Sequence, residues 1–142
     1  MTTIAYKNGV FAYDSRSTCE SVITNNNTDK RRIVNGVVFI LCCAVADYPY
    51  IIDAYFGCTV KKNFDCAGFA IDIGRLYEIG INNNDGFWKM GFPARNCRAL
   101  GSGYKFALTA MDLGCDAVKA VKMAAKRDTG TGGRVRVYQV KK

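Results

Sequence analysis

The sequence contains no histidine. Enzymes that activate a serine or a cysteine with an imidazole base are therefore excluded. An α-amine, a lysine or a carboxylate is left as the base of any hydrolytic site. The seven cysteines form no CxxC pair, so a zinc site is not expected. No metal and no organic cofactor is indicated.

The sequence also lacks a long apolar run. The longest, residues 37–46, is too short for the about 20 residues of a transmembrane helix. The first residues show no basic-then-apolar secretion signal. We therefore expect a cytoplasmic protein with no membrane partner and with reduced cysteines. The length of 142 residues and the hydrophobic content of 49% predict a single domain over residues 1–142 with a substantial core.

Acidic residues are the scarcer charged class, with 12 Asp and Glu against 20 Lys and Arg and a net charge of +8. A nucleic-acid surface would produce such a balance. The basic residues are nevertheless spread along the chain, as on the solvated faces of helices and strand ends. Nucleic-acid binding is therefore the least favoured of the three functions considered below.

Local patterns predict helices packed on a mostly antiparallel sheet system. Two short apolar segments, residues 2–6 and 10–14, flank the hairpin signal Asn8-Gly9. The polar stretch at 15–32 reads as a loop with at most an edge strand. Further strands are expected at 37–43, 69–73, 76–81, 87–90 and 134–140, and further helices at 103–113 and 116–126.

Two helices carry more detailed predictions. Asp47 is expected to cap a helix that has Pro49 in its first turn and ends near Gly57. In the helix at 116–126 the lysines are expected to face outward. The side chains expected to face inward there are Val118, Val121, Met123 and Ala125.

The threonine at position 2 is a candidate nucleophile. If Met1 is removed, Thr2 presents a free α-amine beside its own hydroxyl. A terminal amine titrates near neutrality and can take the hydroxyl proton, so one residue would supply both nucleophile and base. A retained Met1 would block the amine and give an uncleaved precursor or an inactive relative.

Five short motifs follow one another along nearly the whole chain. They are Thr2-Thr3-Ile4, Tyr13 to Thr18 at an expected strand and turn, Ala46-Asp47 at a helix start, Gly101-Ser102-Gly103 at a strand-to-helix corner, and Arg127 to Gly133 at a helix exit. In this order the chain resembles the proteasome-like N-terminal nucleophile hydrolases, which include proteasome β-subunits and the bacterial HslV peptidase; the resemblance makes Thr2 the mature start. Short relatives of this kind are familiar among bacteriophage proteins, which implies a viral product in a bacterial cytoplasm.

The resemblance implies an α+β fold, a four-layer αββα sandwich. Residues 57–68 are too few for the long second helix of the family together with its connections. One helical layer is therefore expected to be reduced to a single helix, and the ring contacts of the family are expected to change with it.

The resemblance also implies roles for six residues. Thr2 would attack the scissile carbonyl, and Asp14 would hold Lys30, whose charge lowers the pKa of the nucleophile and of the amine. A shift of one residue in the alignment would place Asp29 where Lys30 is expected. The residues expected to surround and orient the amine are Ser102, Asp128 and Thr131, the last in place of the usual serine.

Other readings of these motifs remain open. The Gly101–Gly103 corner could be only a helix cap, and Gly130 to Gly133 only a turn. Thr18 is expected to bind the backbone of an extended peptide. Cys43 stands where the family has a glycine whose N–H contributes to the oxyanion hole, and its side chain would crowd a substrate there.

These expectations combine into one leading function, a threonine-type endopeptidase acting after removal of Met1. The alternative is a non-catalytic proteasome-like assembly or inhibitor protein, and the third is nucleic-acid binding. The partners implied are further copies of the chain in a ring or reduced assembly, a peptide or protein substrate, and an ATPase unfoldase or a host protease.

Overall fold

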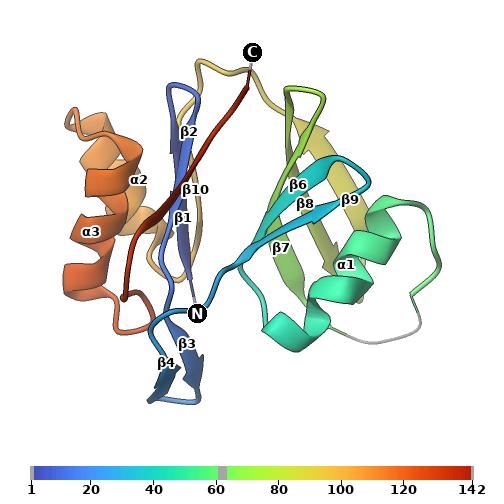
Figure 1. Ribbon diagram of the computed structural model, residues 1–142, viewed down its shortest axis with the longest axis horizontal. Coiled ribbons are helices and arrows are strands. Elements are labelled where there is room, and N and C mark those ends of the chain that lie inside the picture. Colours follow the sequence, from blue (N-terminus) through green and yellow to red (C-terminus); the bar gives the residue numbers. More distant parts are fainter. Residues whose placement is uncertain (1, 61–63, 142) are drawn as a thin grey trace. The chain divides into compact units, whose positions relative to one another are not determined.

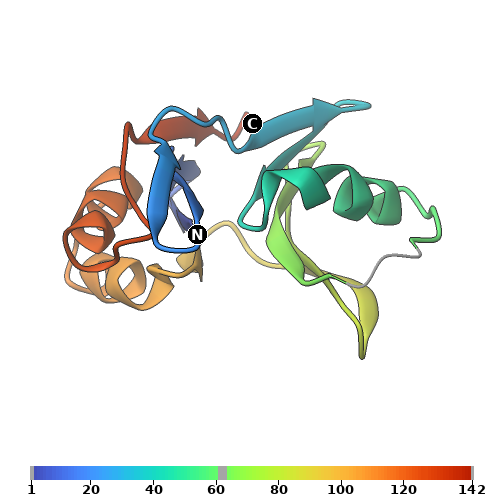
Figure 2. The same cartoon turned by 90° about the horizontal axis from the view of Figure 1, so that it is seen from below.

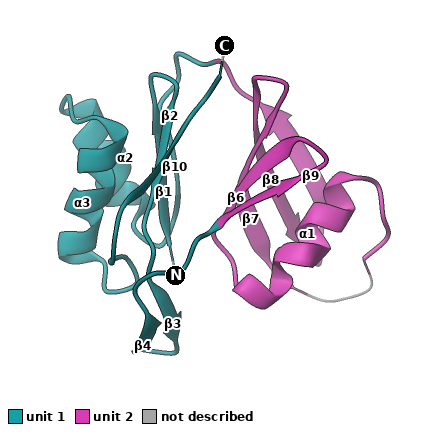
Figure 3. Cartoon of the chain, viewed as in Figure 1, with its two compact units in different colours: residues 1–30, 94–142 teal, residues 31–93 magenta. Residues whose placement is uncertain are grey.

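The computed structural model describes residues 2–60 and 64–141 (Figure 1). Within them the protein is mixed α and β, with three α-helices and antiparallel sheets. The chain divides into two compact units, which we describe separately: unit 1 comprises residues 1–30 and 94–142, and unit 2 residues 31–93 (Figure 3). No helix among the described residues has the length and apolar character needed to cross a bilayer.

The two units differ in charge. Unit 1 holds 14 of the 20 basic residues and 6 of the 12 acidic ones. Unit 2 has six of each and is neutral, so the whole net charge of +8 belongs to unit 1.

Unit 1 is built on a four-stranded antiparallel sheet of order β10-β1-β2-β11. The strands are β1 (Thr3–Lys7), β2 (Val10–Tyr13), β10 (Arg98–Gly101) and β11 (Arg136–Gln139). Asn8 and Gly9 join β1 to β2 with φ of 52° and 81°, the left-handed conformations that a two-residue hairpin turn requires. The predicted hairpin is thus confirmed.

Helices α2 (Tyr104–Asp112) and α3 (Ala117–Arg127) lie side by side on one face of this sheet (Figures 1 and 2). Small side chains make this contact close. The core between helices and sheet is mostly alanine: Ala5, Ala12, Ala107, Ala110, Ala117, Ala120 and Ala124, with Met111 and Val121.

The inward face predicted for α3 is only partly right. Val121 is buried, but Met123 is 44% exposed, and Ala120 and Ala124 are buried instead. Positions 117, 120, 121 and 124 follow the spacing of one helical face, from which Met123 departs. The prediction counted Met123 for its size and overlooked Ala120 and Ala124.

The predicted loop at 15–32 contains a β-hairpin. Strands β3 (Ser17–Cys19) and β4 (Val22–Asn25) form a separate two-stranded sheet. Glu20 adopts a φ of 54° in the turn between them. Threonine, valine and isoleucine in this segment favour extended backbone, a signal that its polar composition obscured.

Unit 2 contains a five-stranded antiparallel sheet of order β5-β6-β7-β8-β9. Its strands are β5 (Arg31–Val34), β6 (Val37–Leu41), β7 (Cys66–Asp72), β8 (Arg75–Asn82) and β9 (Gly86–Gly91). Helix α1 (Tyr48–Tyr55) packs on one face against Phe39 and Leu41. It is the single α-helix among the described residues of unit 2, as expected from the short segment at 57–68.

Asp47 precedes α1 as expected, but its side chain makes no capping hydrogen bond. Its φ of −92° and ψ of −8° are already helical, because a 3-10 turn, η1 (Val45–Asp47), leads directly into α1. A side chain that caps a helix usually belongs to a residue with an extended backbone, and the backbone of Asp47 is not extended.

The expectation that all cysteines are reduced is wrong for two of them, since Cys43 and Cys66 form a disulfide. The cause is the register of β6 and β7, in which Leu41 pairs with Gly68. Because the strands are antiparallel, Cys43, two residues after Leu41, comes opposite Cys66, two residues before Gly68, with their Cα atoms 4.9 Å apart. The five other cysteines are free thiols.

Candidate active site

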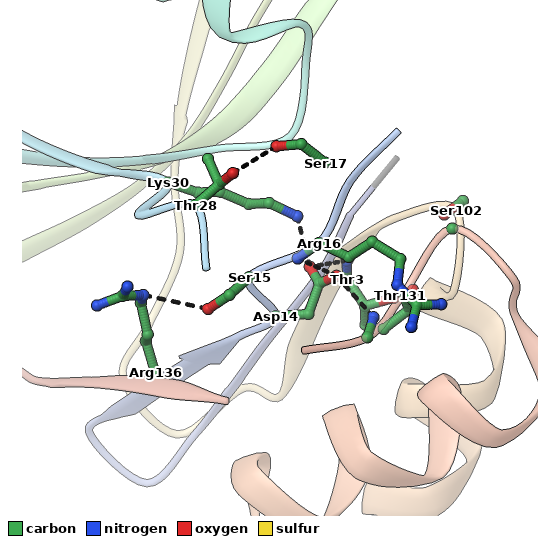
Figure 4. Close-up of polar contacts among 12 residues, drawn as sticks. Thr3, Asp14, Ser15, Arg16, Ser17, Thr28, Lys30, Ser102, Thr131 and Arg136 are labelled. Carbon is green, nitrogen blue, oxygen red and sulfur yellow. Dashed lines mark hydrogen bonds and ion pairs between the residues drawn. The ribbon is translucent and has the colours of Figure 1, made fainter. Parts of the chain in front are cut away.

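A buried ion pair lies at the end of the β1–β2 hairpin. Asp14 directly follows β2, Lys30 directly precedes β5, and both side chains are at most 3% exposed. The Lys30 Nζ donates to Asp14 Oδ1 at 2.7 Å (Figure 4). Asp29, the residue of the alternative alignment, has a side chain 42% exposed and lies 3.9 Å from Arg136. The structure therefore places Lys30, and not Asp29, against Asp14.

The Asp14 carboxylate also collects three backbone N–H groups. Oδ1 accepts from the Thr3 N–H at 3.2 Å, beside the Lys30 ammonium. Oδ2 accepts from the Gly132 N–H at 2.9 Å and from the Arg16 N–H at 3.3 Å. Such a set of donors satisfies a buried carboxylate and fixes its orientation. Asp14 therefore ties the start of β1 to the loop between α3 and β11.

A second carboxylate, Asp128, accepts hydrogen bonds from two hydroxyl groups. Ser102 Oγ donates to Oδ2 at 2.5 Å, and Thr131 Oγ1 donates to the same oxygen at 2.6 Å. The Gly130 N–H donates to Oδ1 at 3.2 Å. Burial raises the pKa of Asp128, but these hydrogen bonds outweigh burial, so the pKa lies below the usual carboxyl value. Asp128 is thus held ionised.

Thr3 connects the two carboxylate clusters. Its Oγ1 lies 2.7 Å from Thr131 Oγ1. A hydroxyl has one proton, and Thr131 gives its own to Asp128, so Thr3 is the donor in this pair. The same residue donates its N–H to Asp14. The network therefore runs without a break from Lys30 to Asp128 through the second residue of the Thr2-Thr3 pair.

Thr2 directly precedes β1 and is 3% exposed. Gly101, the strand partner of Thr3, has a φ of 99°, and a Cβ there would fall 1.7 Å from the Thr2 carbonyl oxygen. A Cβ on Gly103 would fall 2.2 Å from Thr3 Oγ1. Both glycines are therefore needed for the close approach of the corner to the Thr2–Thr3 segment.

The Gly101–Gly103 corner is more than a helix cap. Gly103 is the N-cap residue of α2, and no side chain caps that helix. The Ser102 hydroxyl is instead directed to Asp128. The segment 130–133 is likewise more than a turn, because Thr131 and Gly132 bond to the two carboxylates.

The two residues expected to bind substrate lie in different units. Thr18 is half-buried in β3, where it pairs with Ile23 next to a register shift. Cys43 lies in unit 2 and is half-buried, with its sulfur bonded to Cys66. The side chain expected to crowd a substrate is thus a disulfide and not a free thiol.

Three contributors to the network were not recognised in the sequence: the Thr3 hydroxyl, the Gly132 N–H and Arg16. The run Gly130 to Gly133 signalled only a tight turn, and no pattern marks a backbone donor. Within the described residues no group of three or more His, Cys, Asp or Glu side chains could hold a metal ion.

Two solved structures share this fold. The structure of Thiobacillus denitrificans BPH in complex with epoxomicin is 16% identical in sequence, with 99% of each chain covered and a TM-score of 0.67. A structure of Thiobacillus denitrificans BPH alone is 15% identical, covers 99% of this chain and 98% of its own, and gives a TM-score of 0.64. No protein-family model and no curated protein matches the sequence.

Proposed function

We propose that the protein is an N-terminal threonine hydrolase that cleaves peptide bonds with Thr2 as nucleophile. The observation that carries the proposal is the continuous polar network between Lys30 and Asp128, which passes through Thr3 directly beside Thr2. The proposal requires removal of Met1, which lies outside the described residues.

In the proposed reaction the α-amine of Thr2 takes the proton of its own hydroxyl as the oxygen attacks the substrate carbonyl. The ammonium then gives this proton to the leaving amine as the peptide C–N bond breaks, and water hydrolyses the ester left on Thr2. The Lys30 ammonium, held in place by Asp14, favours negative charge on the attacking oxygen. Ser102 and Thr131, both bonded to Asp128, orient the amine and share its proton. No step in this scheme needs a histidine, and the sequence has none.

We also propose that the chain forms a four-layer αββα sandwich. Each sheet packs one face on the helices of its own unit and carries large apolar side chains on its second face. These are Ile4, Tyr6, Phe11 and Tyr13 in unit 1, and Val38, Ile40, Phe69 and Ile71 in unit 2. A sheet with two apolar faces needs a layer on either side, which supports this proposal.

Covalent labelling tests the proposed nucleophile. Epoxomicin is a suitable probe because its epoxyketone can react with a hydroxyl and a neighbouring amine, and because it binds the structurally similar BPH. Intact mass spectrometry first establishes that Met1 is absent from the sample. We expect the wild type to gain one equivalent of the probe and Thr2→Ala to gain none.

Thr59→Ala is the matched control, because Thr59 is an exposed threonine in unit 2. It should be labelled like the wild type. Failure of the probe to label wild-type protein that has lost Met1 would refute the threonine hydrolase. Quantitative retention of Met1 in the cell would instead favour the non-catalytic assembly or inhibitor protein. Light scattering would test the homo-oligomer, which remains a prediction.

A further inference from the structure

The guanidinium of Arg16 joins two loops that are distant in the sequence. Its Nε donates to Asn26 Oδ1 at 2.9 Å, in the segment between β4 and β5. Its terminal NH1 donates to the Thr129 carbonyl oxygen at 3.1 Å, in the loop between α3 and β11. Figure 4 shows the Arg16 side chain extending from the Asp14 carboxylate toward Thr131.

The same two loops touch through their backbones. A Cβ on Gly132 would lie 2.3 Å from the guanidinium carbon of Arg16, so the guanidinium packs directly on the Gly132 main chain. A Cβ on Gly133 would lie 2.4 Å from the Asn26 carbonyl oxygen. Two consecutive residues without side chains are thus required for Arg16 and Asn26 to reach the α3–β11 loop.

Each loop carries one half of the candidate site. The segment that begins at Asn26 leads into Lys30, and the α3–β11 loop carries Asp128 and Thr131. Arg16 is linked to the same network through its own N–H, which donates to Asp14. One residue therefore contacts the lysine-bearing segment, the hydroxyl-bearing loop and the carboxylate between them.

We propose that Arg16 is a positioning residue that fixes the spacing between the Lys30–Asp14 ion pair and the Ser102–Asp128–Thr131 cluster. The inference rests on the proposed function for its catalytic meaning. The structural part, the linkage of the two loops, can be measured without turnover.

The shape of arginine explains why this residue is used. A guanidinium is planar, can pack flat on the peptide at Gly132, and offers donors in two directions in its own plane. A lysine ammonium is a point charge and cannot make the Asn26 and Thr129 bonds together with that packing. Arg16→Lys and Arg16→Gln are therefore both expected to loosen the α3–β11 loop.

Hydrogen exchange of the Gly132 N–H gives the direct readout, because this group donates to Asp14. In Arg16→Gln and in Arg16→Lys we expect its exchange to be at least about tenfold faster, which corresponds to the loss of about one net hydrogen bond. The amides of β1 and β2, which lie in the sheet, should exchange as in the wild type. Arg127→Gln is the charge-matched control, because Arg127 is exposed in the last turn of α3.

The kinetic readout uses a peptide amide substrate. Because Arg16 acts through Lys30 and Thr131, we expect at least a tenfold loss of kcat in Arg16→Gln and a KM within about twofold of the wild type. Arg127→Gln should change neither parameter.

The outcomes separate the two proposals. If the Gly132 N–H exchanges faster in the Arg16 variants but the wild-type protein shows no turnover, the positioning of the loop is supported and the hydrolase is refuted. Unchanged exchange in both Arg16 variants would overturn the inference. A uniform rise in exchange that includes β1 and β2 would also overturn it, because Arg16 would then act on global stability alone.

Discussion

Gly103→Ala is the most direct test of the packing around Thr3. The backbone of Gly103 has a φ of −98°, which alanine adopts without strain. The added Cβ would nevertheless fall 2.2 Å from Thr3 Oγ1, 3.1 Å from the Ala124 Cβ and 3.2 Å from Asp128 Oδ2. The Thr3 hydroxyl must therefore move, and its hydrogen bond to Thr131 must break or distort.

The expected loss of unfolding free energy in Gly103→Ala has two parts. Overpacking of a close contact costs about 1–3 kcal/mol. Loss of the hydrogen bond from Thr3 adds about 1 kcal/mol. The total of about 2–4 kcal/mol corresponds to a fall in melting temperature of roughly 5–15 °C for a chain of this size. Thermal unfolding followed by circular dichroism measures this change.

Gly91→Ala is the matched control, because a Cβ there would meet its nearest neighbour at an ordinary 3.7 Å. It should leave the melting temperature unchanged or raise it slightly. Combining Gly103→Ala with Thr3→Ala removes the hydroxyl that the new Cβ strikes. We therefore expect the loss of unfolding free energy in the double variant to be smaller than the sum of the two single losses by at least about 1 kcal/mol. Strict additivity, or a Gly103→Ala protein that melts like the control, would refute the reasoning.

Three further predictions concern charge and the disulfide. The pKa of Asp128 is lowered in the folded protein, so its contribution to stability is present above about pH 4 and is lost as the pH falls through the folded pKa. Asp128→Asn should therefore weaken the dependence of the unfolding free energy on acid pH, as measured by urea titrations. Lys30→Met should lower the unfolding free energy by about 3–5 kcal/mol because it leaves the Asp14 carboxylate buried without its cation. Adding Asp14→Asn should restore part of this loss, and an equal or larger loss in the double variant would contradict the reasoning. Thiol titration of the denatured, unreduced protein should find five free cysteines, and seven titratable thiols would disprove the disulfide. Replacing Cys43 and Cys66 by serine should lower the unfolding free energy by about 3 kcal/mol, because the disulfide closes a loop between residues 23 positions apart.

Much of unit 1 could be predicted because its signals are local. Asn8-Gly9 dictates a tight hairpin by itself. The spacing of Asp14 and Lys30 followed from the resemblance, and the structure shows the two side chains in contact. The hairpin signal needs no knowledge of the rest of the fold, whereas the ion pair was expected only from the resemblance.

The contributions that were missed depend on contacts between distant segments. The hydroxyl pair of Thr3 and Thr131 joins positions 128 residues apart. The disulfide of Cys43 and Cys66 depends on the register of two strands, which a sequence without paired spacing does not reveal. In the sequence Arg16 is only part of a predicted turn. Its role could not be predicted because the acceptors of its guanidinium lie on two other loops.

The candidate site and the shortened part of the chain lie in different units. The six residues proposed for catalysis all belong to unit 1. The segment at 57–68, too short for a second helix, belongs to unit 2. The proposed catalytic network involves the sheet of unit 1, the segment that leads into Lys30, the corner before α2 and the exit of α3. The shortness of the segment at 57–68 therefore removes none of the residues proposed for catalysis.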